Sequence, residues 1–124
     1  MEENRSNYTK EEKDSLIKKE INRLKRNYKN MDKARKDISL SLIYRAAFMI
    51  VTLADLEETI NREGTVSEYQ NGENQWGTKK SPEIEIYNTM VKNHAALMKQ
   101  LDDMLPKQPP KEEDDGFDAF VNAK

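Results

Sequence analysis

Few side chains in this 124-residue sequence could carry catalysis. The single histidine, His94, lies in a predicted helix with no acidic residue three or four positions away to orient its ring. We therefore interpret His94 as a helix-surface or interface residue. The chain has no Cys, which excludes a cysteine nucleophile, a thiolate zinc site and a disulfide framework. The sequence predicts no catalytic residue, and we expect no enzyme activity.

Phosphate-transfer and metal chemistry are not supported either. No Gly-rich loop followed by Lys-Ser/Thr is present, so we do not expect this chain to hydrolyse nucleotides. Asp102-Asp103 and Asp114-Asp115 are adjacent pairs, and neighbouring residues on a helix point apart. The acidic residues near the C-terminus lack the loop pattern of a calcium site. We expect no metal and no cofactor.

Charge is the strongest chemical signal, because a formal net charge of -2 conceals a marked segregation. Residues 13–36 hold ten basic and three acidic residues, a balance of +7. Residues 37–76 hold two basic and seven acidic residues, a balance of −5. Opposite charges gathered in different segments indicate separate interaction surfaces. Nine of the basic residues form the predicted DNA-binding set: Lys18, Lys19, Arg23, Lys25, Arg26, Lys29, Lys33, Arg35 and Lys36.

A basic cluster of this kind binds phosphate backbones through counterion release, without reading the base sequence. If about six of these side chains met phosphates, log K would fall with log salt at a slope of roughly −5. No helix-turn-helix glycine turn and no zinc-finger pattern is legible, so sequence-specific readout is not predicted. The alternative interpretation is a solvated helix face that keeps a coiled segment soluble.

Three helices are predicted to position these groups. The first begins with a capping box at Thr9 and Glu12. A second helix is expected from residues 37–41 to Arg62, with Gly64 as its stop. A third begins at Ser81-Pro82-Glu83 and ends at Pro106. Between the last two lies a polar loop, residues 65–80, in which Asn71-Gly72 is a turn signal and a short hairpin remains open.

The apolar residues of the first two helices indicate packing partners. The first helix carries one narrow apolar seam, which needs a partner helix: Ile17, Ile21, Leu24, Tyr28 and Met31. The second is apolar over more than half its circumference, in three stripes, so we expect oligomerisation to cover what the chain itself cannot. The predicted oligomerisation residues are Leu42, Ile43, Ala46, Ala47, Phe48, Met49, Ile50, Val51, Leu53 and Leu56.

The C-terminal segment, residues 107–124, is proline-rich and acidic before it reaches an apolar cluster. One interpretation is a fraying tail. The other is a short motif, Phe117, Phe120 and Val121, which docks on a partner as one turn of amphipathic helix. The N-terminus shows no apolar leader, and the longest apolar run, Ala46 to Val51, is too short to span a bilayer. We therefore expect an intracellular soluble protein with no membrane partner.

One group of residues goes beyond composition. It comprises Tyr69-Gln70-Asn71-Gly72, Gln75, Gly77, Lys79-Lys80-Ser81-Pro82, Tyr87-Asn88, Lys92, Lys99-Gln100-Leu101, Leu105-Pro106-Lys107 and the closing Asp115 to Val121. In these residues the chain resembles the small terminase subunit of tailed bacteriophages. The resemblance covers Tyr69 to about Val121, with a weaker match in length and helical layout before it.

The resemblance implies a non-enzymatic DNA-packaging factor that works in the cytoplasm of the host cell. Small terminases form ring-shaped homo-oligomers, bind the viral genome and deliver it to the large subunit, which carries the ATPase and nuclease. The implied partners are therefore duplex DNA, the large terminase subunit and further copies of the chain. Many small terminases have an N-terminal helix-turn-helix, and here a single basic helix stands in its place.

The sequence thus predicts an all-α protein. Residues 1–36 form a basic helical DNA-binding region, residues 37–106 a helical hairpin that assembles the ring, and residues 107–124 a flexible acidic tail. Two rival interpretations remain. One is a coiled-coil interaction module with no nucleic-acid role, whose bases pair with acids on a neighbour. The other is a small dimeric DNA-binding regulator that selects one sequence over bulk DNA.

Overall fold

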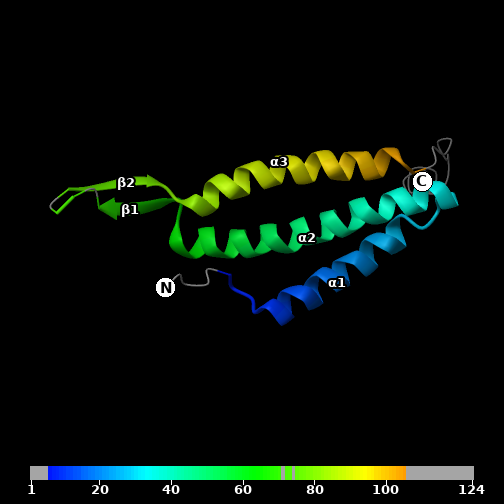
Figure 1. The fold of residues 1–124 in the computed structure, drawn as a ribbon, viewed down its shortest axis with the longest axis horizontal. Helices are drawn as coiled ribbons and strands as arrows, with labels where there is room; N and C mark the ends of the chain where they lie inside the picture. The colour runs from blue at the N-terminus through cyan, green and yellow to red at the C-terminus, as the bar shows by residue number, and fades with distance from the viewer. Residues whose placement is uncertain (1–5, 71, 74, 106–124) are drawn as a thin grey trace, which may run out of the picture.

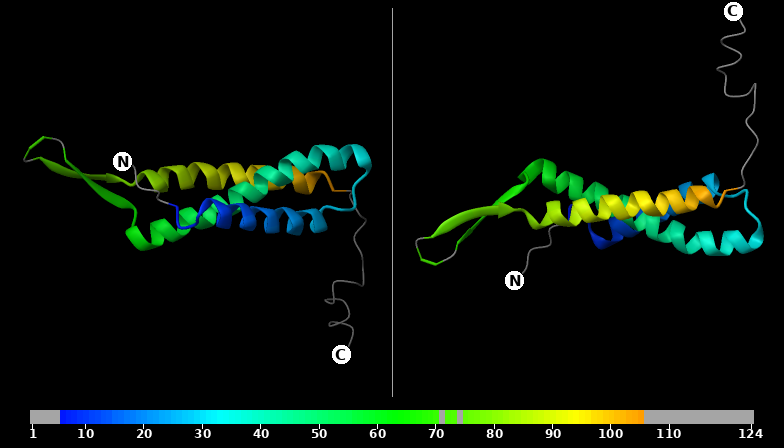
Figure 2. Two further views of the ribbon diagram at one scale, coloured as in Figure 1. Left: turned by 60° about the horizontal axis from the view of Figure 1, so that its bottom comes forward. Right: turned by 90° about the horizontal axis from the view of Figure 1, so that it is seen from above.

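The structure, a computed structural model, describes residues 6–70, 72–73 and 75–105. In chain order its elements are α1 (Lys10–Asn27), α2 (Lys33–Glu63), β1 (Val66–Gln70), β2 (Trp76–Lys80) and α3 (Pro82–Asp103). The fold is mostly helical, as the sequence predicted. The long helix α2 packs against both α1 and α3, which run antiparallel to it, and the hairpin projects beyond one end of the bundle (Figures 1 and 2).

The first helix begins where its capping box predicts. The Thr9 hydroxyl accepts a hydrogen bond from the backbone N–H of Glu12 at 3.0 Å. In return the Glu12 carboxylate accepts one from the backbone N–H of Thr9 at 2.8 Å. Two amide groups that would otherwise lack partners at the helix start are therefore satisfied by side chains.

The second helix begins at Lys33, four residues before the earliest predicted start at residue 37. Asp32 is its N-cap, and its carboxylate accepts a hydrogen bond from the backbone N–H of Arg35 at 2.9 Å. The predicted boundary between residues 36 and 37 therefore falls inside a helix, and the basic residues are divided between α1, a short link and α2. The end of α2 agrees with the prediction, because Gly64 follows Glu63 with a φ of 85° that favours glycine.

The predicted polar loop, residues 65–80, contains a β-hairpin. Strands β1 and β2 pair antiparallel, from Val66 opposite Lys80 to Gln70 opposite Trp76. The backbone N–H of Ser81 donates to the carbonyl of Thr65 at 2.9 Å, which closes the base of the hairpin. At the other end Gly72 has a φ of 105°, a conformation that glycine adopts at little cost.

The core lies where the C-terminal ends of α1 and α3 meet the N-terminal half of α2 (Figure 1). Its buried residues are Leu24, Tyr28, Met31, Ile43, Ala46, Ala47, Leu97 and Leu101. The seam of α1 thus finds its partner helix in α2 of the same chain. Ala46 and Ala47 are fully buried, and their small side chains let the neighbouring helices approach α2 closely.

Among the described residues, α2 is the one helix that is long and apolar enough, by length and composition alone, to cross a membrane. Its most apolar 18-residue window has a mean hydropathy of 1.5. The longest uninterrupted apolar run, Ala46 to Val51, is far shorter than this helix, so the sequence did not predict such a candidate. The core helix of a soluble protein meets the same criterion, and α2 is packed on two sides by α1 and α3.

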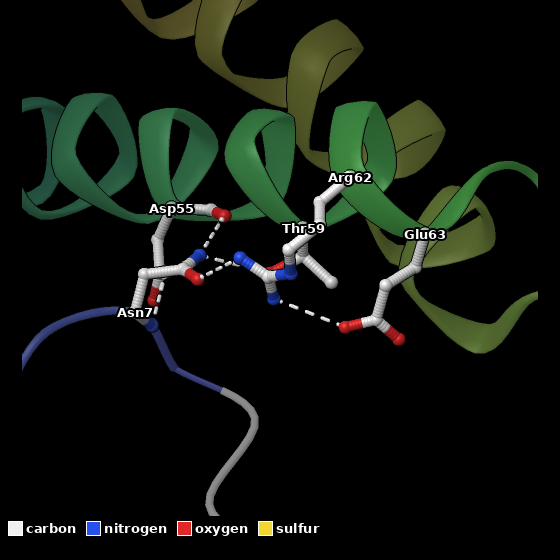
Figure 3. Close-up of polar contacts among 5 residues, drawn as sticks. All are labelled: Asn7, Asp55, Thr59, Arg62 and Glu63. Atoms are coloured by element: carbon white, nitrogen blue, oxygen red, sulfur yellow. Dashed lines mark hydrogen bonds and ion pairs between the residues drawn. The ribbon is translucent and has the colours of Figure 1, made fainter.

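A polar network ties the segment before α1 to the C-terminal half of α2 (Figure 3). Asp55 is only 8% exposed, and its carboxylate accepts hydrogen bonds from the Ser6 hydroxyl at 2.6 Å and from the Asn7 backbone N–H at 2.8 Å. The Asn7 side-chain amide also donates to Asp55 at 2.7 Å and to the Thr59 hydroxyl at 2.9 Å. Arg62 donates to the Asn7 side-chain carbonyl at 2.6 Å. Asn7 is thus hydrogen-bonded to three residues of α2: Asp55, Thr59 and Arg62.

The network also sets the charge state of Asp55. Burial alone would raise the pKa of this carboxyl, but the hydrogen bonds from Ser6 and Asn7 outweigh burial and leave the pKa below its ordinary value of 3.8. A carboxyl whose pKa is lower in the folded state stabilises the fold above its ordinary pKa. That contribution is lost as the pH falls through the folded-state pKa. At neutral pH it is therefore fully present.

We predict that Asp55→Ala lowers the free energy of unfolding by about 2 kcal/mol at pH 7, because it leaves partly buried donors on Ser6 and Asn7 without an acceptor. Urea denaturation measures the change. Asp103→Ala is the control, since Asp103 forms only an exposed pair with Lys99 at 3.1 Å and should change stability by less than about 0.5 kcal/mol. Equal effects of the two substitutions would show that the network contributes nothing.

Candidate nucleic-acid interface

The exposed face of α1 is basic. At about 100° per residue, four of its cationic side chains fall in an arc of about 120° opposite Leu24, which is buried against the bundle. With Lys29, in the link just after the helix, these make five exposed cations: Lys18, Lys19, Lys25, Arg26 and Lys29. We call this the basic face. The packing of the apolar seam on α2 therefore turns these charges away from the bundle.

Not every predicted base is equally available. Arg23 forms an ion pair with Glu20 on the same helix at 2.8 Å. The Lys25 ammonium lies 5.8 Å from the centre of the Tyr44 ring. Lys13, which was not in the predicted set, lies 4.7 Å from the centre of the exposed Phe48 ring. These groups are already engaged on the protein surface, so Lys18, Arg26 and Lys29 are the better candidates for phosphate contacts.

The remaining three predicted bases, Lys33, Arg35 and Lys36, are exposed in the first turn of α2. That turn contains no acidic residue to complement the positive end of the helix dipole. Arg35 donates a hydrogen bond to the carbonyl of Met104 at 3.0 Å, so it fastens the end of α3 to the start of α2. Positive charge therefore continues from α1 across the link to this end of the bundle.

A hollow of about 260 Å³ opens between α1 and α2 at the same end. Three lysines stand around it, Lys25, Lys29 and Lys36. The rest of its lining is Tyr28, Ser39, Leu40 and Ile43, of which Leu40 is half-buried and the others are buried. We call it the lysine-rimmed hollow. It combines positive charge with an apolar floor, which sequence reasoning did not anticipate.

The predicted oligomerisation residues are used mainly inside one chain. Ile43, Ala46, Ala47, Val51 and Leu53 are buried, whereas Leu42, Met49, Ile50 and Leu56 are partly buried. Phe48 is the exception, at 47% exposed. Because α1 and α3 both pack along α2, one chain covers part of these stripes, and a role of the remaining surface in oligomerisation stays a prediction. Tyr44 and Phe48 remain uncovered.

Beside these two rings runs an apolar groove between α2 and α3. Two hollows of about 460 and 400 Å³ share Met49 and Met90 in their linings. Tyr44 and Phe48 line the first hollow, and Ile86, 51% exposed, lines the second. An exposed, continuous apolar strip of this kind is typical of a protein–protein contact.

The remaining sequence predictions concern metal ligands, the C-terminal docking motif and His94. Within the described residues no group of three or more His, Cys, Asp or Glu side chains could hold a metal ion. The predicted partner-binding residues Phe117, Phe120 and Val121 lie outside the described residues. His94 is partly buried in α3, and its Nε2 atom is buried without a hydrogen-bond partner among the described residues.

No family model, curated protein or solved structure matches this chain. The interpretation of the basic face therefore depends on its own geometry and chemistry.

His94 generates a pH prediction. Burial lowers its pKa below the ordinary value of 6.5, because the charged ring loses hydration in the fold. Between the folded and the ordinary pKa the unfolded chain binds more protons, so stability rises with pH there and is lost as the pH falls below about 6.5. We expect the free energy of unfolding to fall between pH 7.5 and 5.5.

His94→Gln should remove most of that pH dependence, since His94 is the only histidine in the chain. Urea denaturation of both proteins at the two pH values measures it. An unchanged pH dependence in the variant would show that other groups cause it.

Proposed function

We propose that this chain is a bacteriophage DNA-packaging factor of the terminase small-subunit type. It binds viral duplex DNA in the host cytoplasm and recruits and regulates the large subunit, which carries the ATPase and nuclease. The observation that supports the proposal most directly is the basic face, with exposed cations on α1 that continue into the first turn of α2. The chain is a binding factor in this proposal, and the ATP-binding loop belongs to its partner.

The proposed grip on DNA is electrostatic. The 18 residues of α1 make a helix of about 27 Å. Duplex DNA carries one phosphate charge for about every 1.7 Å of its axis, so several phosphates lie within reach of such a face. The side chains of the basic face are long and solvated, which suits contacts to phosphate oxygens rather than a preorganised reading of base edges. The grip therefore tolerates any base sequence.

Self-association is the second part of the proposal. The groove between α2 and α3, with Phe48 and Ile86 at its surface, is an apolar strip that a second copy would cover. A closed ring requires the groove of each copy to meet a different surface of the next copy, because a groove that meets the same groove of another copy gives only a dimer. The large subunit would meet the ring through the tail motif, Phe117, Phe120 and Val121.

The coiled-coil module is less well supported. That interpretation needs the seam of α1 to be available to another chain, but Leu24 and Tyr28 are buried against the bundle of their own chain. A dimeric regulator that selects one DNA sequence would need side chains held rigidly towards base edges. Of the predicted bases on α1, Arg23 alone is fixed by an ion pair among the described residues.

The DNA-binding proposal is tested by reversing three charges of the basic face, Lys18→Glu, Arg26→Glu and Lys29→Glu, in one protein. If each side chain meets one phosphate, affinity for duplex DNA should fall by two to three orders of magnitude at about 0.1 M salt. The salt slope of log K should become shallower by about 3. Fluorescence anisotropy with a labelled duplex, titrated at several salt concentrations, measures both quantities.

The matched control is Lys80→Glu, Lys92→Glu and Lys99→Glu, which changes the net charge equally but lies on β2 and α3. It should keep most of the affinity. If both triple variants weaken binding equally, net charge rather than the basic face controls affinity, and the proposed interface is wrong.

Self-association is tested with Phe48→Glu, which places a charge in the apolar groove. We expect the native mass, measured by light scattering, to fall from an oligomer to a monomer while the helical circular dichroism stays unchanged. Ala96→Glu, at an exposed position of α3 outside the groove, is the control and should leave the mass unaltered. A wild-type protein that is monomeric at all concentrations would reject the proposed ring.

A further inference from the structure

The lysine-rimmed hollow has a composition that a nucleic-acid backbone alone does not explain. Phosphates would pair with Lys25, Lys29 and Lys36, but they would leave the half-buried Leu40, which lies beside the buried Ile43 on the apolar floor, without a partner. The group that fits both is an aromatic or aliphatic side chain flanked by carboxylates. A cavity of about 150 Å³ is large enough to hold a benzene ring, and this hollow measures about 260 Å³.

Such a group occurs in this chain beyond the described residues. Residues 112–121 read Glu-Glu-Asp-Asp-Gly-Phe-Asp-Ala-Phe-Val, and Phe117 stands between Asp115 and Asp118. The segment carries five acidic and no basic residues, the opposite of the rim of the hollow. We propose that this acidic segment of the same chain occupies the lysine-rimmed hollow, with Phe117 on the apolar floor and its neighbouring carboxylates facing the three lysines.

The place where the chain leaves the bundle supports this occupant. The carbonyl of Met104 accepts the hydrogen bond from Arg35 at 3.0 Å, and the next residue of α2, Lys36, lines the hollow. The chain therefore starts towards residue 112 from the end of the bundle at which the hollow opens. Figure 1 shows the end of α3 next to the start of α2.

The length of the connection is sufficient. Twelve positions separate Leu105 from Phe117. A proline-rich connection of twelve residues spans up to about 37 Å, at about 3.1 Å per residue. A short tether also gives an effective concentration in the millimolar range, so a contact that would be weak between separate molecules is well populated within one chain.

The contact has a consequence that depends on the proposed function. Lys29, one of the better candidates for phosphate contacts, also lines the hollow. The acidic segment and the phosphates of DNA therefore compete for the same ammonium group. DNA would displace the segment and release Phe117, Phe120 and Val121 for another partner, while an occupied hollow would weaken non-specific binding to DNA.

The test measures NMR signals of residues that line the hollow, in the full-length protein and without DNA. The aromatic rings are removed as Phe117→Ser and Phe120→Ser, and the methyl resonances of Leu40 and Ile43 are compared with those of the wild type by NMR. Loss of a ring stacked on these side chains should shift both resonances. The methyl groups of Met49 and Met90, in the other groove, serve as the control and should not move.

The role of the lysine charges at the rim is tested with the same NMR measurement. Lys29→Gln with Lys36→Gln should reproduce the Leu40 and Ile43 shifts of the aromatic variant, whereas Lys92→Gln with Lys99→Gln on α3 should not. If the Leu40 and Ile43 resonances of the aromatic variant equal those of the wild type, the acidic segment does not occupy the hollow. That result would leave the DNA-binding proposal intact, because no DNA enters the measurement.

Mixing two versions of the protein shows whether the acidic segment in the hollow comes from the same chain or from a second copy. Labelled Phe117→Ser, Phe120→Ser protein is combined with an excess of unlabelled wild type. Unchanged Leu40 and Ile43 resonances support occupation within one chain. Return of both resonances towards their wild-type positions would show that the segment comes from a second copy, and would overturn the assignment to the same chain.

Discussion

The packing of α2 between α1 and α3 is the constraint on which the rest of this structure depends. A helix that is apolar around more than half of its circumference must be covered on more than one side. Ala46 and Ala47 permit that cover because their small side chains leave room for both neighbours. Once the seam of α1 is fixed on α2, the bases of α1 must face solvent. The basic face is therefore a consequence of core packing.

Local signals predicted local structure well. The capping box at Thr9, the stop at Gly64 and the Pro82 start of α3 were legible because each depends on residues a few positions apart. The network around Asp55 could not be predicted, since Asn7 and Asp55 are 48 residues apart and no local pattern indicates such a contact. The nine basic residues were identified by composition. Their division between two helices depended on the Asp32 cap, which the charge count did not consider.

The apolar stripes of α2 are a second feature whose partner a local pattern does not identify. A stripe indicates that a surface must be covered, but it does not say by which helix. The narrow seam of α1 and the face of α3 together cover part of the surface assigned to oligomerisation. Ile38, Tyr44 and Phe48 stay exposed on α2, and Lys13 and Lys25 lie over the two aromatic rings. Aromatic rings beside ammonium groups tolerate water better than aliphatic side chains do, which lets the uncovered part persist in a free chain.

The charges at the start of α2 oppose its stability. Cations in the first turn interact unfavourably with the helix dipole, by about 0.3–1 kcal/mol each when exposed, and against these three cations stands one capping carboxylate, that of Asp32. A bound anion would reverse the sign of this interaction, so anion binding and the stability of α2 are coupled. Salt screens such exposed charges but does not weaken apolar contacts. The two proposed surfaces should therefore respond differently to ionic strength, with assembly through the apolar groove persisting where the electrostatic grip on DNA has been lost.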